Sequence, residues 1–128
     1  MNDPKRPRAS ALLDSAAGDV RRAVQQAEVT EVPTQVELRE AGWHLIHLCG
    51  DLAELLPILA EQTSNYSEHA VLREVSGEDT GPTLARAYRE LATARRALEQ
   101  AEAAAREYYT AISRLAAVVQ PGVAGDAG

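Results

Sequence analysis

Apolar residues recur every seven positions along the C-terminal third of the chain. One series takes every seventh residue from Leu84 to Val119, and a second takes every seventh residue from Ala87 to Leu115. This pattern is typical of a helix that packs along its whole length against another helix. Alanine fills most of the second series, which predicts a close approach of the two backbones. We therefore expect a long helix from about Pro82 to Val119 and a helical partner for it.

A second helix, expected over residues 34–63, is the candidate partner. Thr34 and Glu37 have the capping-box spacing that begins a helix, and Pro57 predicts a kink or break near residues 53–57. If the two long helices run antiparallel, Gly42 and Cys49 lie opposite the C-terminal part of the last helix, near Tyr108. The expected apolar seam of this second helix is Leu38, Gly42, Leu45, Cys49, Leu52, Leu56 and Leu59.

The remaining periodic segment is short. Apolar spacing predicts a first helix from about Ala11 to Glu28, capped by Ser10 and weakened at Gly18. A further short helix is expected over about 68–75. The fold class predicted from these patterns is all-α: a small helical bundle dominated by two long antiparallel helices, 34–63 and 82–119, with a shorter N-terminal helix. We expect a basic disordered tail over 1–8, a single domain over 9–120 and a flexible tail over 121–128.

Composition supports a small helical protein. The 128 residues are 45% hydrophobic and 25% charged, with 4% aromatic residues and no Phe, so Leu, Val, Ile and Ala must build the core. No apolar run approaches the roughly 20 residues of a membrane span, and no apolar signal core follows the basic start. Together these observations predict a cytoplasmic protein without a membrane partner. Arginine outnumbers lysine twelve to one, which is typical of a GC-rich bacterial genome.

The net charge of −6 is unevenly distributed. Residues 28–79 carry eleven acids against two arginines, whereas residues 80–120 carry six arginines against four glutamates. The acidic middle and the basic C-terminal helix are complementary, so they are expected to pack on each other or on a second copy.

The second helix also carries a stripe of potential metal ligands. Its members recur at helical spacing, and His44, His47 and Asp51 are the candidates for a metal site. The stripe lies opposite the Leu38 and Leu45 seam, so a face exposed to water is the favoured interpretation. The full stripe is Glu37, Glu40, His44, His47, Asp51 and Glu54.

Other chemical signals are weak. The single cysteine, Cys49, lies in the apolar seam, where a thiol is usually a small hydrophobe, and no phosphate-binding glycine loop is present. We therefore expect no enzyme and no cofactor. A DNA-associated regulator is the alternative, in which the basic N-terminus joins arginines of the last helix. Ion pairs with Glu90 and Glu99 and the acidic net charge disfavour it. The arginines concerned are Arg86, Arg89, Arg95 and Arg96.

The favoured function is a non-enzymatic helical interaction or assembly module that self-associates. It is expected as a homo-oligomer, with a dimer favoured, or with a helical protein partner, acting as an adaptor or regulator in a bacterial cytoplasm. The expected interaction residues are Trp43, Tyr88 and Tyr109, because exposed aromatic side chains often dominate binding energy. A DNA-associated regulator and a metal-dependent activity at His44 and His47 are the alternatives.

Overall fold

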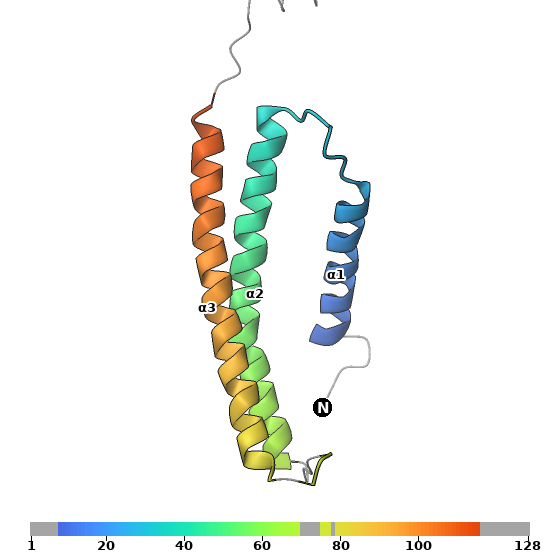
Figure 1. The fold of residues 1–128 in the computed structure, drawn as a ribbon, viewed down its shortest axis with the longest axis vertical. Helices are drawn as coiled ribbons and strands as arrows, with labels where there is room; N and C mark the ends of the chain where they lie inside the picture. The colour runs from blue at the N-terminus through green and yellow to red at the C-terminus, as the bar shows by residue number, and fades with distance from the viewer. Residues whose placement is uncertain (1–7, 70–74, 78, 116–128) are drawn as a thin grey trace, which may run out of the picture. The chain divides into compact units, whose positions relative to one another are not determined.

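A computed structural model describes residues 8–69, 75–77 and 79–115 of the chain (Figure 1). Within these ranges the protein is all-α, with α1 at Ala9–Gln26, α2 at Gln35–His69 and α3 at Thr80–Ser113. The prediction of two dominant long helices and a shorter N-terminal helix is confirmed. Residues 1–33 and 34–128 form two compact units, and each is described by itself. A single domain over 9–120 stays a prediction.

The unit that contains α1 is a single amphipathic helix. α1 begins two residues earlier and ends two residues earlier than expected, and Gly18 does not interrupt it. The predicted cap at Ser10 is wrong, because Ser10 already lies inside the helix. The N-cap residue of α1 is Arg8, whose side chain makes no capping hydrogen bond. None of the α1 side chains is buried.

The start of α2 is fixed by local chemistry. The backbone N–H of Glu37 donates to Thr34 Oγ1 at 3.1 Å, and the Thr34 N–H donates to Glu37 Oε1 at 3.4 Å. This reciprocal pair is the predicted capping box, which satisfies N–H groups that the first helical turn leaves free.

The end of α2 differs from expectation. The helix continues through Pro57 to His69, so the predicted break near residues 53–57 is wrong. Proline removes one hydrogen bond of the helix, to the carbonyl of Ala53, and the packing of α2 on α3 maintains the helix across that gap. Of the short helix predicted over 68–75, Glu68 and His69 instead end α2 and Val75 lies in a turn; residues 70–74 lie outside the described ranges, so the rest of that helix stays a prediction.

α3 begins with a side-chain cap. Asp79 Oδ1 accepts a hydrogen bond from the Gly81 N–H at 3.2 Å, and Pro82 occupies the first turn as predicted. The helix ends at Ser113 rather than Val119, and Arg114 lies in a turn; residues 116–119 lie outside the described part of the chain.

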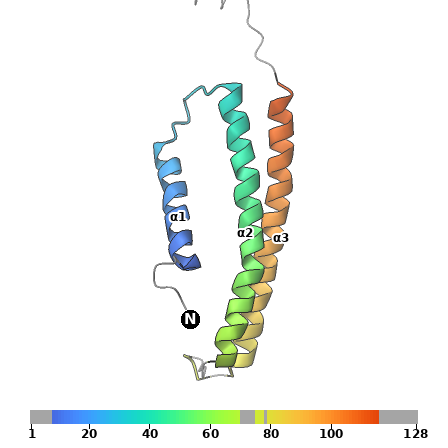
Figure 2. The same cartoon turned by 180° about the vertical axis from the view of Figure 1, so that it is seen from behind.

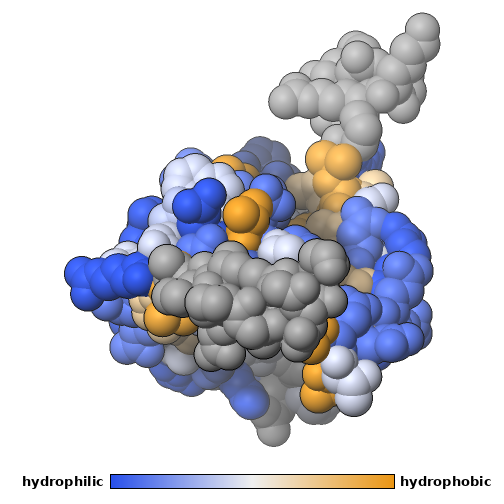
Figure 3. All heavy atoms as spheres, turned by 90° about the horizontal axis from the view of Figure 1, so that it is seen from above, coloured by the Kyte–Doolittle hydropathy of each residue, from blue (hydrophilic) through white to orange (hydrophobic). Residues whose placement is uncertain are grey.

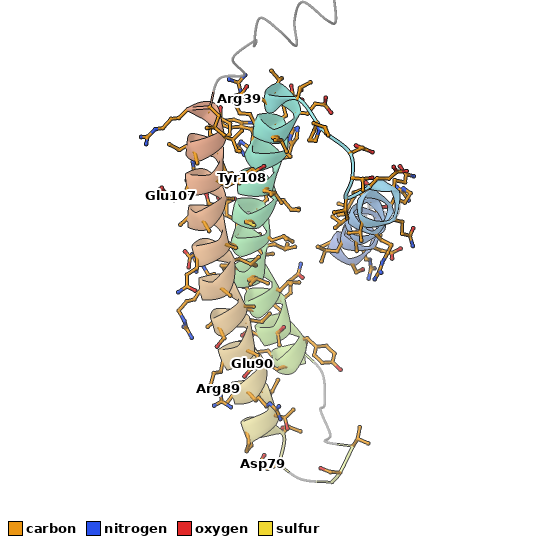
Figure 4. All side chains as sticks on the ribbon, turned by 45° about the horizontal axis from the view of Figure 1, so that its top comes forward. Arg39, Asp79, Arg89, Glu90, Glu107 and Tyr108 are labelled. Carbon is orange, nitrogen blue, oxygen red and sulfur yellow. The ribbon has the colours of Figure 1, made fainter. Side chains whose placement is uncertain are left out.

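α2 and α3 lie side by side as an antiparallel hairpin (Figures 1 and 2). Gln35 Nε2, at the start of α2, donates to the Ile112 carbonyl in the last turn of α3 at 2.9 Å. Tyr108 reaches from α3 toward α2, as Figure 4 shows, whereas Glu107 points away. A Cβ on Gly42 would lie 3.0 Å from Tyr108 Cδ2, which confirms the predicted proximity of Gly42 and Tyr108.

The line of contact between α2 and α3, here called the seam, keeps the predicted period of seven residues. The first predicted series on α3 is buried or half-buried from Leu84 to Ile112. On α2, Gly42 is buried and Cys49 and Leu56 are half-buried, also as predicted. The described part of the chain has a small core, and its buried hydrophobic residues are Ile46, Ala53 and Ala105.

Both helices are nevertheless rotated from the predicted orientation. On α2, Leu45 is 47% exposed, whereas Ile46, one residue later, is 3% exposed. On α3 the second predicted series is wrong beyond Ala87, because Ala94 and Ala101 are exposed. Residues one position later in that series take their place in the seam, namely the half-buried Tyr88, Glu102 and Tyr109.

The rotation has a physical reason. The backbone of α3 comes close to α2 at Gly42, where a Cβ would lie 3.4 Å from the Cα of Tyr109, whereas the predicted alanines Ala94 and Ala101 are exposed. A Cβ on Gly50 would lie 3.3 Å from the carboxyl carbon of Glu102, so the absent side chain leaves room for Glu102 to lie over α2. Each long helix carries a stripe of apolar residues that is wider than the line of contact between the two helices. One edge of each stripe therefore lies outside the seam.

The closeness of Gly42 to α3 makes a stability prediction. In Gly42→Leu the new side chain must displace Tyr108 and the Tyr109 backbone, whose Cα would lie 3.4 Å from a Cβ on Gly42. We expect a net loss of up to about 2 kcal/mol in unfolding free energy, since overpacking costs about 1–3 kcal/mol and helix propensity returns about 0.8. Urea denaturation followed by circular dichroism, at one protein concentration, measures it.

Ala103→Leu is the matched control for that variant. Ala103 is exposed on α3, so the same side chain added there finds room. An equal loss in both variants would contradict the close packing at Gly42.

Candidate interaction surface

The apolar residues of α2 and α3 that lie beside the seam form an apolar face on one side of the hairpin. Viewed from one end, antiparallel helices advance in opposite rotational senses. Residues just before the seam positions therefore emerge on the same side of both helices. This apolar face consists of Leu45, Leu48, Leu52, Leu55 and Leu59 on α2 and Ala87, Ala94, Ala97, Ala101, Ala104 and Tyr108 on α3.

The leucines of the apolar face are incompletely covered. Leu45 is 47% exposed and Leu48 is 37% exposed, while Leu52, Leu55 and Leu59 are half-buried. Figure 3 shows apolar residues reaching the surface between hydrophilic ones. A row of partly exposed leucines along one helix is larger than the scattered apolar residues of an ordinary surface, and such patches mark interaction sites.

α2 is unusually apolar for a helix with so little cover. Among the described residues it is the one helix long and apolar enough to cross a membrane by length and composition, and 11% of its most apolar 18-residue window is buried. One such helix is weak evidence for a membrane span, because the core helix of a soluble protein passes the same test. Few residues of that window are fully buried, so the hairpin alone leaves part of the apolar surface of α2 accessible to water.

The opposite side of the hairpin is a polar hollow of about 380 Å³. Its walls include Glu102 and Arg106, whose carboxylate and guanidinium form an ion pair at 2.8 Å. Charges of both signs share the hollow, so neither a phosphate nor a metal ion finds a concentrated opposite charge there. The remaining charged or titratable side chains that line it are His47, Asp51, Glu54, Arg95 and Glu99.

Aromatic rings gather beside this hollow, near the start of α2. The Trp43 ring lies 4.6 Å from the His47 ring in an edge-on arrangement and 5.6 Å from the Tyr109 ring, tilted by 51°. The structure thus brings two predicted interaction residues, Trp43 and Tyr109, together. The third, Tyr88, lies 21 residues away on α3, about 31 Å along the helix axis. Sequence reasoning missed His47 as a ring partner, although its i,i+4 spacing from Trp43 was the signal.

The predicted metal ligands do not form a site. His44, His47 and Asp51 are all exposed, as is the rest of the stripe that contains them. Within the described ranges no three His, Cys, Asp or Glu side chains gather closely enough to hold a metal ion. Cys49 is half-buried in the seam.

The four arginines of the nucleic-acid alternative are exposed but do not act as one patch. Arg95 lines the polar hollow, while Arg96 donates to the Thr93 hydroxyl at 3.3 Å. Arg89 points away from the hairpin (Figure 4). Arg86 is exposed like the others. The ion pairs expected with Glu90 and Glu99 do not form among the described residues, whereas Glu102 pairs with Arg106.

Comparisons with protein families, with curated proteins and with solved structures give no match for this chain. Clues to the function of the protein therefore lie in the surfaces of the hairpin. Of these, the apolar face is the largest departure from an ordinary solvated surface.

The aromatic cluster predicts a measurable coupling between Trp43 and Tyr109. A double-mutant cycle with Trp43→Leu and Tyr109→Leu should give an interaction free energy of about 0.5–1.5 kcal/mol, because their rings are in contact. Urea unfolding of the four proteins in the cycle measures it. The matched cycle of Trp43→Leu with Tyr88→Leu should give a value near zero, since distant sites are additive. Equal coupling in both cycles would show that the ring contact is not the source.

Proposed function

We propose that the protein is a non-enzymatic helical interaction module that self-associates through its apolar face to form a dimer. In this role it serves as an adaptor or regulator that assembles with its own kind in a bacterial cytoplasm. The observation that carries the proposal is the row of partly exposed leucines on α2, of which Leu45 and Leu48 are the most exposed.

The size of the core supports the proposal. The buried hydrophobic residues of the described chain are one isoleucine and two alanines, Ile46, Ala53 and Ala105. A core this small contributes little to stability, and small chains commonly compensate by oligomerising. Covering the apolar face with another protein surface adds the missing core.

The energy available from that face is of the right order. Burying the exposed part of Leu45 or Leu48 contributes about 1 kcal/mol, and each of the less exposed Leu52, Leu55 and Leu59 contributes less. The ten leucines of two apolar faces therefore contribute about 4–10 kcal/mol in total. The loss of translational and rotational freedom on association is of the same order. The affinity of the dimer therefore depends on how well the two faces fit.

The chemistry of the described side chains also supports a binding role over an enzymatic one. The thiol of Cys49 is half-buried in the seam, and the polar hollow holds paired charges such as Glu102 and Arg106. Neither arrangement offers an activated nucleophile within reach of a substrate.

The proposal predicts a native mass of twice the 13.8 kDa of one chain and the loss of that mass in Leu48→Asp. Leu48 is 37% exposed and lies outside the seam, so the hairpin itself should tolerate the change. Two aspartates per dimer would then lie in an apolar interface, and we expect the dissociation constant to rise at least about 100-fold. Sedimentation equilibrium over a range of micromolar concentrations measures both masses.

The control is Ala103→Asp, which adds the same charge on the exposed outer side of α3. It should leave the native mass unchanged, and circular dichroism should show equal helicity in all three proteins. A wild-type protein that stays monomeric at every concentration would falsify the proposed function.

A further inference from the structure

We infer that the two copies are related by a two-fold axis parallel to their helices, so that the leucines of each α2 pack against the alanines of the partner's α3. This inference rests on the proposed self-association and specifies the arrangement of the copies. It follows from the sizes of the side chains, the charges of the helices and the register of the hairpin.

The side chains that α2 and α3 contribute to the apolar face differ in size. Toward the other copy α2 presents five leucines, Leu45 to Leu59, whereas α3 presents five alanines between Ala87 and Ala104. Over Leu48 to Leu59, leucine side chains that meet alanines give one uniform helix separation. Leucine on leucine beside alanine on alanine requires two separations within the same interface, which leaves voids. The sizes therefore favour α2 on the partner's α3, and the face is complementary to itself.

The length of the face also points to a second hairpin. α2 has 35 residues and α3 has 34, about 52 and 51 Å of helix. An occupant that covers the face must bring helices of that length, and a second copy brings two of them.

Charge favours the same arrangement. α2 carries six acids against one arginine, a net charge of −5, while α3 carries five arginines against four glutamates, a net charge of +1. An axis parallel to the helices places each α2 between two α3 helices and diagonally across from the other α2. An axis perpendicular to the helices instead places the two α2 helices side by side, where their charges repel.

A two-fold axis parallel to the helices also fixes the register. Rotation about that axis does not move a residue along it, so the partner's α3 lies level with the chain's own α3. Within one copy, Gln35 is level with Ile112, Gly42 with Tyr108 and Gly50 with Glu102. Counting onward from Gly50, Leu52 is level with Gln100.

Leu52 therefore packs beside the partner's Ala101, the nearest residue of the apolar face to that level. The neighbouring leucines follow in order, so Leu48 meets the partner's Ala104 and Leu59 meets the partner's Ala94. The three contacts use equivalent positions on both copies, as a closed two-fold interface requires.

Disulfide trapping in the full-length chain tests the arrangement. Cys49 is the single cysteine, so both probes are made in a Cys49→Ala background. One protein carries Leu52→Cys and the other carries Ala101→Cys, and equal amounts are unfolded, refolded together and oxidised. We expect disulfide-linked dimers that join the two variants and hold about half of the chains, the share that random pairing assigns to mixed dimers. Each variant oxidised alone should yield no linked dimer on a denaturing gel.

Ala103→Cys mixed with Leu52→Cys is the matched control and should give no linked dimer, because Ala103 lies on the exposed outer side of α3. Linked dimers from Leu52→Cys alone would overturn the inference. Leu52 is the middle of the five leucines, and a perpendicular axis through the centre of the face would bring its two copies together. A native dimer that gives no mixed disulfide also overturns it. A monomeric native mass, by contrast, overturns the proposed function itself.

Discussion

The structure depends on the single line of contact that two antiparallel helices can share. Gln35 bonded to Ile112 and Gly42 pressed against Tyr108 fix where that line runs. Each helix carries an apolar stripe wider than the line, because leucines and alanines occupy three positions of each seven. What the seam leaves out, Leu45 and Leu48 above all, must be exposed to water or covered by another chain.

Local features of the fold were predictable because their chemistry lies within a few residues. The Thr34–Glu37 capping box needs one turn of chain, and it formed as predicted. The seven-residue period identified both long helices, since it reports an interaction that repeats along the whole helix. Ser10 failed as a cap because α1 begins at Ala9, which places Ser10 inside the helix.

The rotation of the helices was not predictable from the period. Leu45 and Ile46 are adjacent and both apolar, so periodicity ranks them equally, and the choice between them is made by the opposing helix. Gly50 illustrates this, because its missing side chain leaves room for Glu102 of α3 to lie over α2. In the candidate interaction surface, too, residue types were predictable and contacts between helices were not. Trp43 was identified from its residue type, but its pairing with Tyr109 depends on the antiparallel register.

The two sides of the hairpin differ in a way that limits association. One side is lined by charges, with Glu102 and Arg106 of α3 paired in the wall of a hollow, and burying that side would desolvate ions without apolar compensation. The other side is the apolar face. A molecule with one self-complementary interaction surface forms a closed dimer, since that surface is fully buried in each copy and no second surface is available to bind a third copy. In the proposed dimer the polar hollows face outward, and the charged side of the seam acts as the element that stops growth at two copies.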